Sequence, residues 1–204
     1  MKRIIGIAAL AALLVPIPIQ AQEFPAPAAT LSLDEKLLNT LKRKAVVVID
    51  AAVAGRRCDG LVMNVGQIVN GKSQVRRLRA SSKLFGKTRF GGITVAPEGE
   101  YVLESLTCDP YGQTRTNFNG PHAKFHVRAG EFVNLGTLKI RYESDGFRTG
   151  KTHRSIENLG PDAMAYVKEQ FPQTIAKMIN RPMTLVGPAD ARIQFRLCGL
   201  LACL

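Results

Sequence analysis

Apolar and β-branched residues occur in short runs through the middle of the chain. The clearest runs are 46–49 (VVVI) and 61–69 (LVMNVGQIV), and turn residues such as glycine separate the runs from one another. Short β-branched runs bounded by turn residues predict β-strands. Weaker runs extend this prediction to 73–80, 92–95, 101–106, 124–127 and 132–142. About seven strands at this spacing, without alternating helices, predict a mainly β fold with an antiparallel β-sandwich over 45–142.

The segment 73–80 fits the pattern least well. In a strand, Val75 and Arg77 would lie on one face, and Arg76 and Leu78 on the other. Neither face is then purely apolar, and charged residues on a strand are typical of a sheet edge. We therefore predict an edge strand here.

Two segments outside the strands have helical spacing. Ser32 and Glu35 have the spacing of a capping box, and leucines at helical spacing follow them, which predicts a short helix within 32–44. Pro161, between a glycine and an aspartate, has the form of a helix start, and Pro172 should interrupt the helical segment that follows. We expect 108–121 and 143–159 to be polar loops. The region 143–204 should pack on the sandwich as a loop, a C-terminal helix and a cysteine-bearing tail.

The first residues have the features of a secretory signal. Lys2 and Arg3 precede an apolar run at 4–15, and Ala21 offers a small residue for cleavage. An uncleaved anchor is the alternative, but this run spans only about 18 Å as a helix, against a bilayer core of about 30 Å. We predict a signal peptide (1–21), a flexible linker (22–31) and a periplasmic or secreted protein with no transmembrane anchor after cleavage. No cysteine follows the apolar run before Cys58, so the protein is not expected to be a lipoprotein.

The cysteine count favours disulfide bonds. The chain has four cysteines, all in the part expected to be exported: Cys58, Cys108, Cys198 and Cys203. An even number in an oxidising compartment favours two bridges, for which three pairings are possible. We favour Cys198–Cys203, which enclose a short segment containing Gly199, together with Cys58–Cys108. A metal site is the alternative, but the chain has no CxxC pair and no histidine beside a cysteine.

Two segments resemble a known group of proteins. The sequences VAPEGEYVL (95–103) and FHVRAGEFVNLGTL (125–138) resemble paired hairpins in uncharacterised exported bacterial proteins with a prealbumin-like (transthyretin/carboxypeptidase-regulatory-like) β-sandwich. The residues 162–166 and 171–172 are similar to the C-terminal helix of those proteins, whereas Glu98 departs from their usual Pro-Gly pair. The resemblance implies a prealbumin/Ig-like sandwich, and it brings no accepted activity or catalytic residue. Independently, Gly130 suits a turn with positive φ, and Gly136 suits a bulge.

Positive charge is concentrated in one region of the chain. Lys and Arg number 28 against 16 Asp and Glu, a formal net charge of +12, of which Lys2 and Arg3 should leave with the signal. Six of these cations lie within a short stretch without an acidic residue: Arg76, Arg77, Arg79, Lys83, Lys87 and Arg89. We call these six residues the basic stripe, and its composition favours a polyanion such as anionic lipid, lipopolysaccharide or nucleic acid. Export makes nucleic acid an unexpected physiological partner. The alternative is a solvated edge whose charges prevent aggregation.

No motif in the chain indicates catalysis, a metal or a cofactor. His122 and His126 would lie about 13 Å apart in a strand, too far for one ion, and no serine has the GxSxG setting of a nucleophile. We therefore expect a non-enzymatic exported binding or envelope-associated accessory domain that requires no cofactor. Its partner would be an unknown protein or an anionic envelope component contacted through the basic stripe. The alternatives are an envelope hydrolase with a spatially assembled acid site, and a subunit that adds its edge strand to a larger assembly.

Overall fold

The computed structural model describes residues 32–55, 58, 60–84, 87–108, 116–144, 149–194, 198–199 and 202–203. The predicted signal peptide and linker lie outside these residues. Within the described part of the chain, no helix has both the length and the apolar character needed to cross a membrane.

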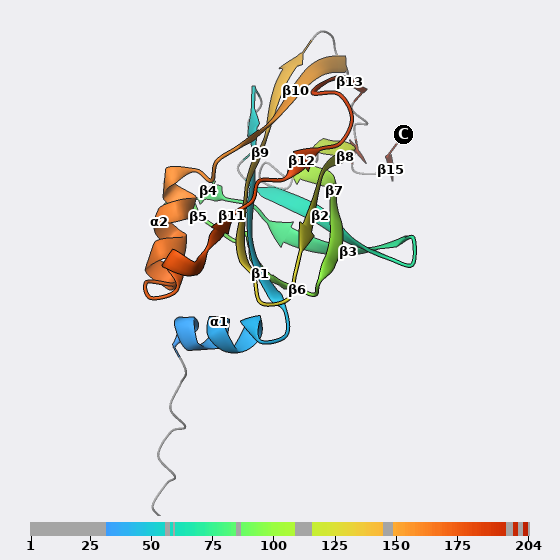
Figure 1. Cartoon of the computed structure of the whole chain (residues 1–204). Coiled ribbons are helices and arrows are strands. Elements are labelled where there is room, and N and C mark those ends of the chain that lie inside the picture. The colour runs from blue at the N-terminus through green and yellow to red at the C-terminus, as the bar shows by residue number, and fades with distance from the viewer. Residues whose placement is uncertain are drawn as a thin grey trace, which may run out of the picture. The chain divides into compact units, whose positions relative to one another are not determined.

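Two β-sheets account for most of the described residues (Figure 1). The first sheet has the order β13-β10-β9-β1-β6, and β11 pairs with β9 beside this path. Its strands are β1 (Ala45–Ala54), β6 (Ile93–Ala96), β9 (Phe132–Ser144), β10 (Thr149–Glu157), β11 (Ile179–Asn180) and β13 (Asp190–Gln194). The strand β9 runs parallel to β1 and β11, so this sheet is mixed rather than purely antiparallel.

The second sheet is antiparallel, with the order β12-β8-β7-β2-β3. Its strands are β2 (Leu61–Val69), β3 (Lys72–Arg79), β7 (Gly99–Cys108), β8 (Thr116–Val127) and β12 (Thr184–Leu185). Two small pairs stand apart from both sheets: β4 (Ser82–Leu84) with β5 (Lys87–Arg89), and β14 (Cys198–Gly199) with β15 (Ala202–Cys203).

The two sheets enclose a common apolar core, so the predicted β-sandwich is confirmed. Val47 and Ile49 from β1 pack in this core with Met63 from β2 and Leu103 from β7. Because successive side chains of a strand point to opposite faces, Val46 from β1 lies on the other side of its sheet. The strand β1 is therefore buried on both faces, which explains its uninterrupted run of β-branched residues.

The helices cover the outer face of the first sheet. Helix α1 (Leu33–Leu41) begins with the predicted capping box, and α2 (Pro161–Gln170) begins at the predicted proline. Leu37 of α1 and Val167 of α2 belong, with Val46, to a second apolar cluster. A 3-10 helix, η1 (Ile175–Lys177), follows the interruption that was predicted at Pro172. Figure 1 shows α1 in blue and α2 in orange, and residues of both helices belong to this cluster.

The C-terminal segment joins the two sheets along one edge. It pairs with β9 as β11, with β8 as β12, and with β10 as β13. Arg181 forms an ion pair with Glu131, and the Met183 amide donates to the Leu135 carbonyl at 3.0 Å. At the opposite edge, β3 and β6 approach each other, and Arg76 Nη1 donates a hydrogen bond to the Val95 carbonyl at 3.4 Å. The C-terminal segment thus closes one edge of the sandwich, whereas the edge strands β3 and β6 form the other.

Two loop predictions were wrong. The segment 143–159 contains β10, and 108–121 contains the first half of β8. In β10 the buried side chains Thr152 and Arg154 alternate with the exposed side chains of Lys151 and His153. Because the buried positions are themselves polar, the hydrophobic pattern of a half-buried strand is missing. By contrast, β3 lies at the sheet edge where the sequence placed it.

The structure has the predicted disulfide between Cys58 and Cys108 and a bulge at Gly136. Cys58 and Cys108 form a disulfide that joins the chain before β2 to the end of β7, with Cα atoms 5.4 Å apart. Cys198 lies directly opposite Cys203 in the β14–β15 pair, a register that suits the second predicted bridge, which stays a prediction. Gly136 has a φ of 78°, and a Cβ there would lie 2.4 Å from the Glu157 carbonyl oxygen, so the bulge in β9 requires glycine.

Candidate functional site

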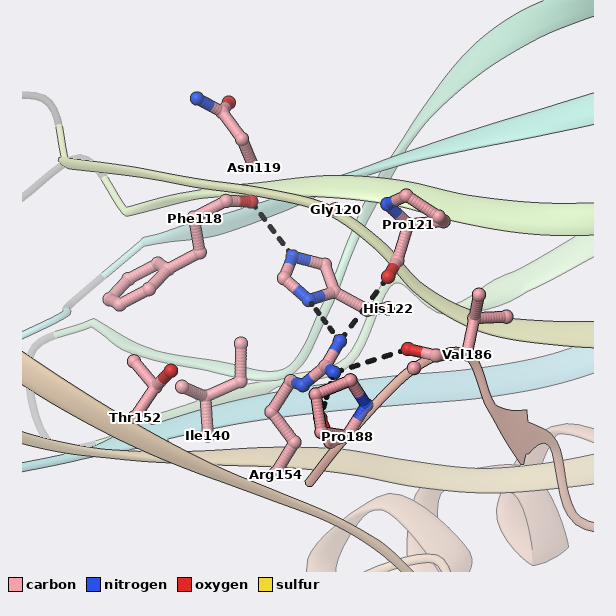
Figure 2. Close-up of a pocket in the computed structure, with 11 residues that line it drawn as sticks. Phe118, Asn119, Gly120, Pro121, His122, Ile140, Thr152, Arg154, Val186 and Pro188 are labelled. Atoms are coloured by element: carbon pink, nitrogen blue, oxygen red, sulfur yellow. Dashed lines mark hydrogen bonds between the residues drawn. The ribbon is translucent and has the colours of Figure 1, made fainter. Parts of the chain in front are cut away.

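A pocket of about 290 Å³ lies at the closed edge of the sandwich, between β8 of the second sheet and β9 and β10 of the first. The chain after β12 forms another of its walls. Apolar side chains make up much of the lining: Phe118, Pro121, Ile140, Val186 and Pro188. The polar side chains that line it are those of Asn119, His122, Thr152 and Arg154. We call this cavity the Arg154 pocket, because Arg154 is the one charged residue in its described lining (Figure 2).

The Arg154 side chain comes from β10 and is only 7% exposed. Its Nη1 donates to the Pro121 carbonyl at 3.2 Å and faces Nδ1 of His122 at 3.4 Å. Its Nη2 donates to the Val186 carbonyl at 3.1 Å and to the Pro188 carbonyl. Arginine remains protonated in proteins, so this is a buried cation whose partners are three carbonyl groups and an imidazole. None of these partners carries a compensating negative charge.

His122 reaches the pocket because β8 bulges. Between the register pairs Leu103↔Ala123 and Ser105↔Asn119, β8 has more residues than β7, and His122 is one of the extra residues. His122 is only 4% exposed, although its neighbour Pro121 is exposed. An extra residue in a strand re-aims a side chain, which accounts for the inward direction of this imidazole.

The hydrogen bonds of His122 define one tautomer. Because arginine can only donate, Nδ1 of His122 accepts from Arg154 Nη1. The proton then lies on Nε2, which donates to the Phe118 carbonyl at 2.8 Å. Burial lowers the pKa of His122 below its ordinary value of 6.5, and the positive charge of Arg154 lowers the pKa further, whereas the Phe118 carbonyl opposes both effects. His122 is therefore neutral at pH 7.

These interactions determine what the pocket can do chemically. Both ring nitrogens of His122 have partners, so neither is available to a metal ion. The described residues of the chain contain no group of three or more His, Cys, Asp and Glu side chains placed to hold one. Among the described residues that line the pocket there is neither a carboxylate nor a serine, so these residues offer no acid pair and no Ser–His pair. Its described lining combines one buried cation with apolar walls.

The structure places the basic stripe on a different part of the molecule. Arg76, Arg77 and Arg79 lie on the exposed edge strand β3, whereas Lys83, Lys87 and Arg89 lie on the β4–β5 hairpin that follows. The side chains of the hairpin residues are outside the described part of the structure.

Within β3 the three arginines have different settings. Arg76 and Leu78 face the space between the two edge strands, where a cavity of about 20 Å³ lies. Arg77 and Arg79 point to the opposite face of the strand, beside Asn64 and Val62 of β2. Neither Arg77 nor Arg79 has an acidic residue directly opposite in the register. Three of the six residues of the basic stripe thus lie on one strand, and two of these, Arg77 and Arg79, have no acidic residue opposite them on β2.

Sequence reasoning missed Arg154 altogether and considered His122 only as a metal ligand. One signal was available in 152–156 (THRSI), where Thr152, Arg154 and Ile156 occupy alternate positions. That alternation has the period of a strand, but only Ile156 is apolar. The burial of Arg154 depends on the carbonyl groups of two distant segments, which no local pattern reveals.

No family model matches this chain, and no match was found among curated proteins or solved structures. The prealbumin-like resemblance therefore rests on the two hairpin segments and the C-terminal helix described above.

Proposed function

We propose that this protein is an exported, non-enzymatic accessory domain that contacts anionic envelope surfaces through the basic stripe. The observation that carries the proposal is the position of Arg77 and Arg79 on the exposed strand β3, with no acidic residue opposite them on β2. Cations without acidic partners can meet an anionic surface without first breaking an ion pair. The resemblance to prealbumin-like proteins and the signal peptide belong to the same proposal, and the sequence is what supports them.

The energetics favour a surface of anionic head groups. A basic residue close to an anionic membrane contributes about 1 kcal/mol, and this contribution falls off within a Debye length of about 10 Å at 0.1 M salt. Arg77 and Arg79 lie two residues apart on one face of β3, so their charges act on the same patch of surface. Loss of both charges should therefore weaken binding by about tenfold or more.

The solvated edge remains the competing interpretation of the same residues. Charges on an edge strand also prevent strand addition by another copy of the chain. The two interpretations differ in a measurable way, because only the first predicts binding that depends on the sign and density of surface charge.

Sedimentation with lipid vesicles tests the proposal. The mature protein is mixed with neutral phosphatidylcholine vesicles, or with vesicles that also contain phosphatidylglycerol, at low and at moderate salt. We expect binding only to the anionic vesicles, and we expect moderate salt to weaken it. Equal binding to both compositions, or no effect of salt, would overturn the proposal.

A matched pair of variants separates the stripe from net charge alone. Arg77→Gln/Arg79→Gln removes two charges from β3, and Lys42→Gln/Arg43→Gln removes two exposed charges at the end of α1. We expect the first variant to lose binding by about tenfold or more and the second to lose much less. Equal losses would show that the whole positive charge of the protein is responsible rather than β3.

A further inference from the structure

We propose that the Arg154 pocket is a binding site for a small monocarboxylate that has an apolar body. No carboxylate is among the described residues that line the pocket, and a ligand of this class would bring both a counter-charge for Arg154 and an apolar surface for the walls. The pocket lies at the edge opposite β3, so this proposal does not depend on the basic stripe.

The charge of Arg154 is the first reason. A buried charge is costly unless it is paired, and the partners of this one are carbonyl dipoles and the neutral His122. Carbonyl groups can orient a guanidinium, but they leave its full positive charge in place. An anion in the adjoining cavity would neutralise a charge that the described residues around it do not.

The hydrogen bonds of the guanidinium are the second reason. Arginine has five N–H donors, and the contacts to Pro121, His122, Val186 and Pro188 use the four donors on Nη1 and Nη2. The remaining donor, on Nε, is buried and has no partner. Figure 2 shows the guanidinium between His122 and the segment that contains Val186 and Pro188. The Val186 and Pro188 carbonyls account for the two donors on Nη2, and the Pro121 carbonyl and His122 account for the two on Nη1, whereas the donor on Nε remains for a ligand atom.

The size and walls of the cavity define the ligand class. A cavity of about 150 Å³ accommodates benzene, so one of about 290 Å³ has room for a small ring or branched chain with a carboxylate. Binding pockets of this kind combine apolar walls with a few polar groups that orient the ligand, and Thr152 and Arg154 are such groups here. A single cation with one unused donor suits a monoanion better than the dianionic form of phosphate.

Nuclear magnetic resonance of the folded protein tests this directly. Benzoate is titrated while the methyl signals of Ile140 and Val186 and the ring signals of His122 are followed. Benzamide, which has the same shape without the charge, and inorganic phosphate, which has charge without an apolar body, serve as comparison ligands. We expect benzoate to shift all three residues saturably, with an apparent affinity at least tenfold higher than that of either comparison ligand.

Two variants localise the effect. Val186→Phe fills part of the cavity while leaving the Val186 carbonyl available to Arg154, so we expect it to weaken benzoate binding at least tenfold. Arg77→Gln, at the opposite edge, should bind benzoate as the unchanged protein does. The proposal is overturned if benzoate produces no saturable shift, if benzamide or phosphate binds equally well, or if Val186→Phe binds as before.

Discussion

The arginines at the two edges of the sandwich show how differently one residue type can be used. Arg77 and Arg79 lie in a dense basic segment, and both are exposed on β3. Arg154 stands in a polar segment without other notable features, and its guanidinium is buried between the two sheets. High charge density in a sequence therefore indicates exposure, because many like charges cannot all be buried. A single arginine can be buried when several backbone carbonyls converge on it.

The structural contribution of the two edges differs as well. The edge that contains Arg154 is closed by the C-terminal segment, which crosses from the first sheet to the second and back. Arg154 holds this segment through its contacts with the Val186 and Pro188 carbonyls. At the other edge, β3 contributes exposed cations but few buried side chains. We therefore expect the first edge to be sensitive to single substitutions and the second to be tolerant.

The largest expected effect is that of Arg154→Met. This substitution keeps an apolar stem but removes the donors for the Pro121, Val186 and Pro188 carbonyls. Leaving such acceptors without partners should lower the free energy of unfolding by about 2–3 kcal/mol, measured by urea denaturation. Hydrogen exchange at the Val186 amide, which donates to the His122 carbonyl, should also become faster.

Lys151→Met is the matched control for this experiment. Lys151 lies on the same strand, β10, but its side chain is exposed, so its loss should change stability by less than about 0.5 kcal/mol. Equal effects of the two substitutions would mean that the carbonyl contacts of Arg154 contribute nothing to stability.

An intermediate effect is expected from the pH dependence of stability. Because the pKa of His122 lies below 6.5 in the folded protein, the unfolded chain binds a proton first as the pH falls. The free energy of unfolding should therefore decrease as the pH drops below 6.5, until the folded-state pKa is reached. Each unit of lowered pKa corresponds to about 1.4 kcal/mol.

Urea denaturation between about pH 7 and pH 5 measures this pH dependence, and a His122 variant separates the contribution of His122 from that of other groups. His122→Gln should flatten the curve relative to the unchanged protein. Parallel curves for His122→Gln and the unchanged protein would contradict the assignment of this pH dependence to the Arg154 pocket.

The smallest expected effect is at the β3 edge. Arg77→Gln and Arg79→Gln should each change the free energy of unfolding by less than about 0.5 kcal/mol, because both side chains are exposed and neither faces an acid on β2. Urea denaturation of the two variants measures this. A loss above about 1 kcal/mol would show that the arginines of this edge also stabilise the fold, and the contrast between the two edges would fail.

Much of the fold could be read from local patterns. The run at 46–49 predicted a buried strand because β1 is covered on both faces, by the second sheet and by the helices. The capping box at Ser32 and the proline at 161 marked the starts of α1 and α2, since those signals act within a single turn of helix. The mixed first sheet was not predicted, because the parallel pairing of β1 with β9 joins segments far apart in the chain.

The sequence by itself determined the elements that neighbouring residues signal: the apolar strands, the starts of the two helices and the exposed basic strand. Only the tertiary structure decided the role of Arg154 and His122. The β8 bulge turns His122 inward, and the C-terminal segment brings the carbonyls of Val186 and Pro188 to the guanidinium. A buried polar strand such as β10 is stable only when partners from distant parts of the chain satisfy its side chains. For that physical reason, no pattern of neighbouring residues could reveal the pocket.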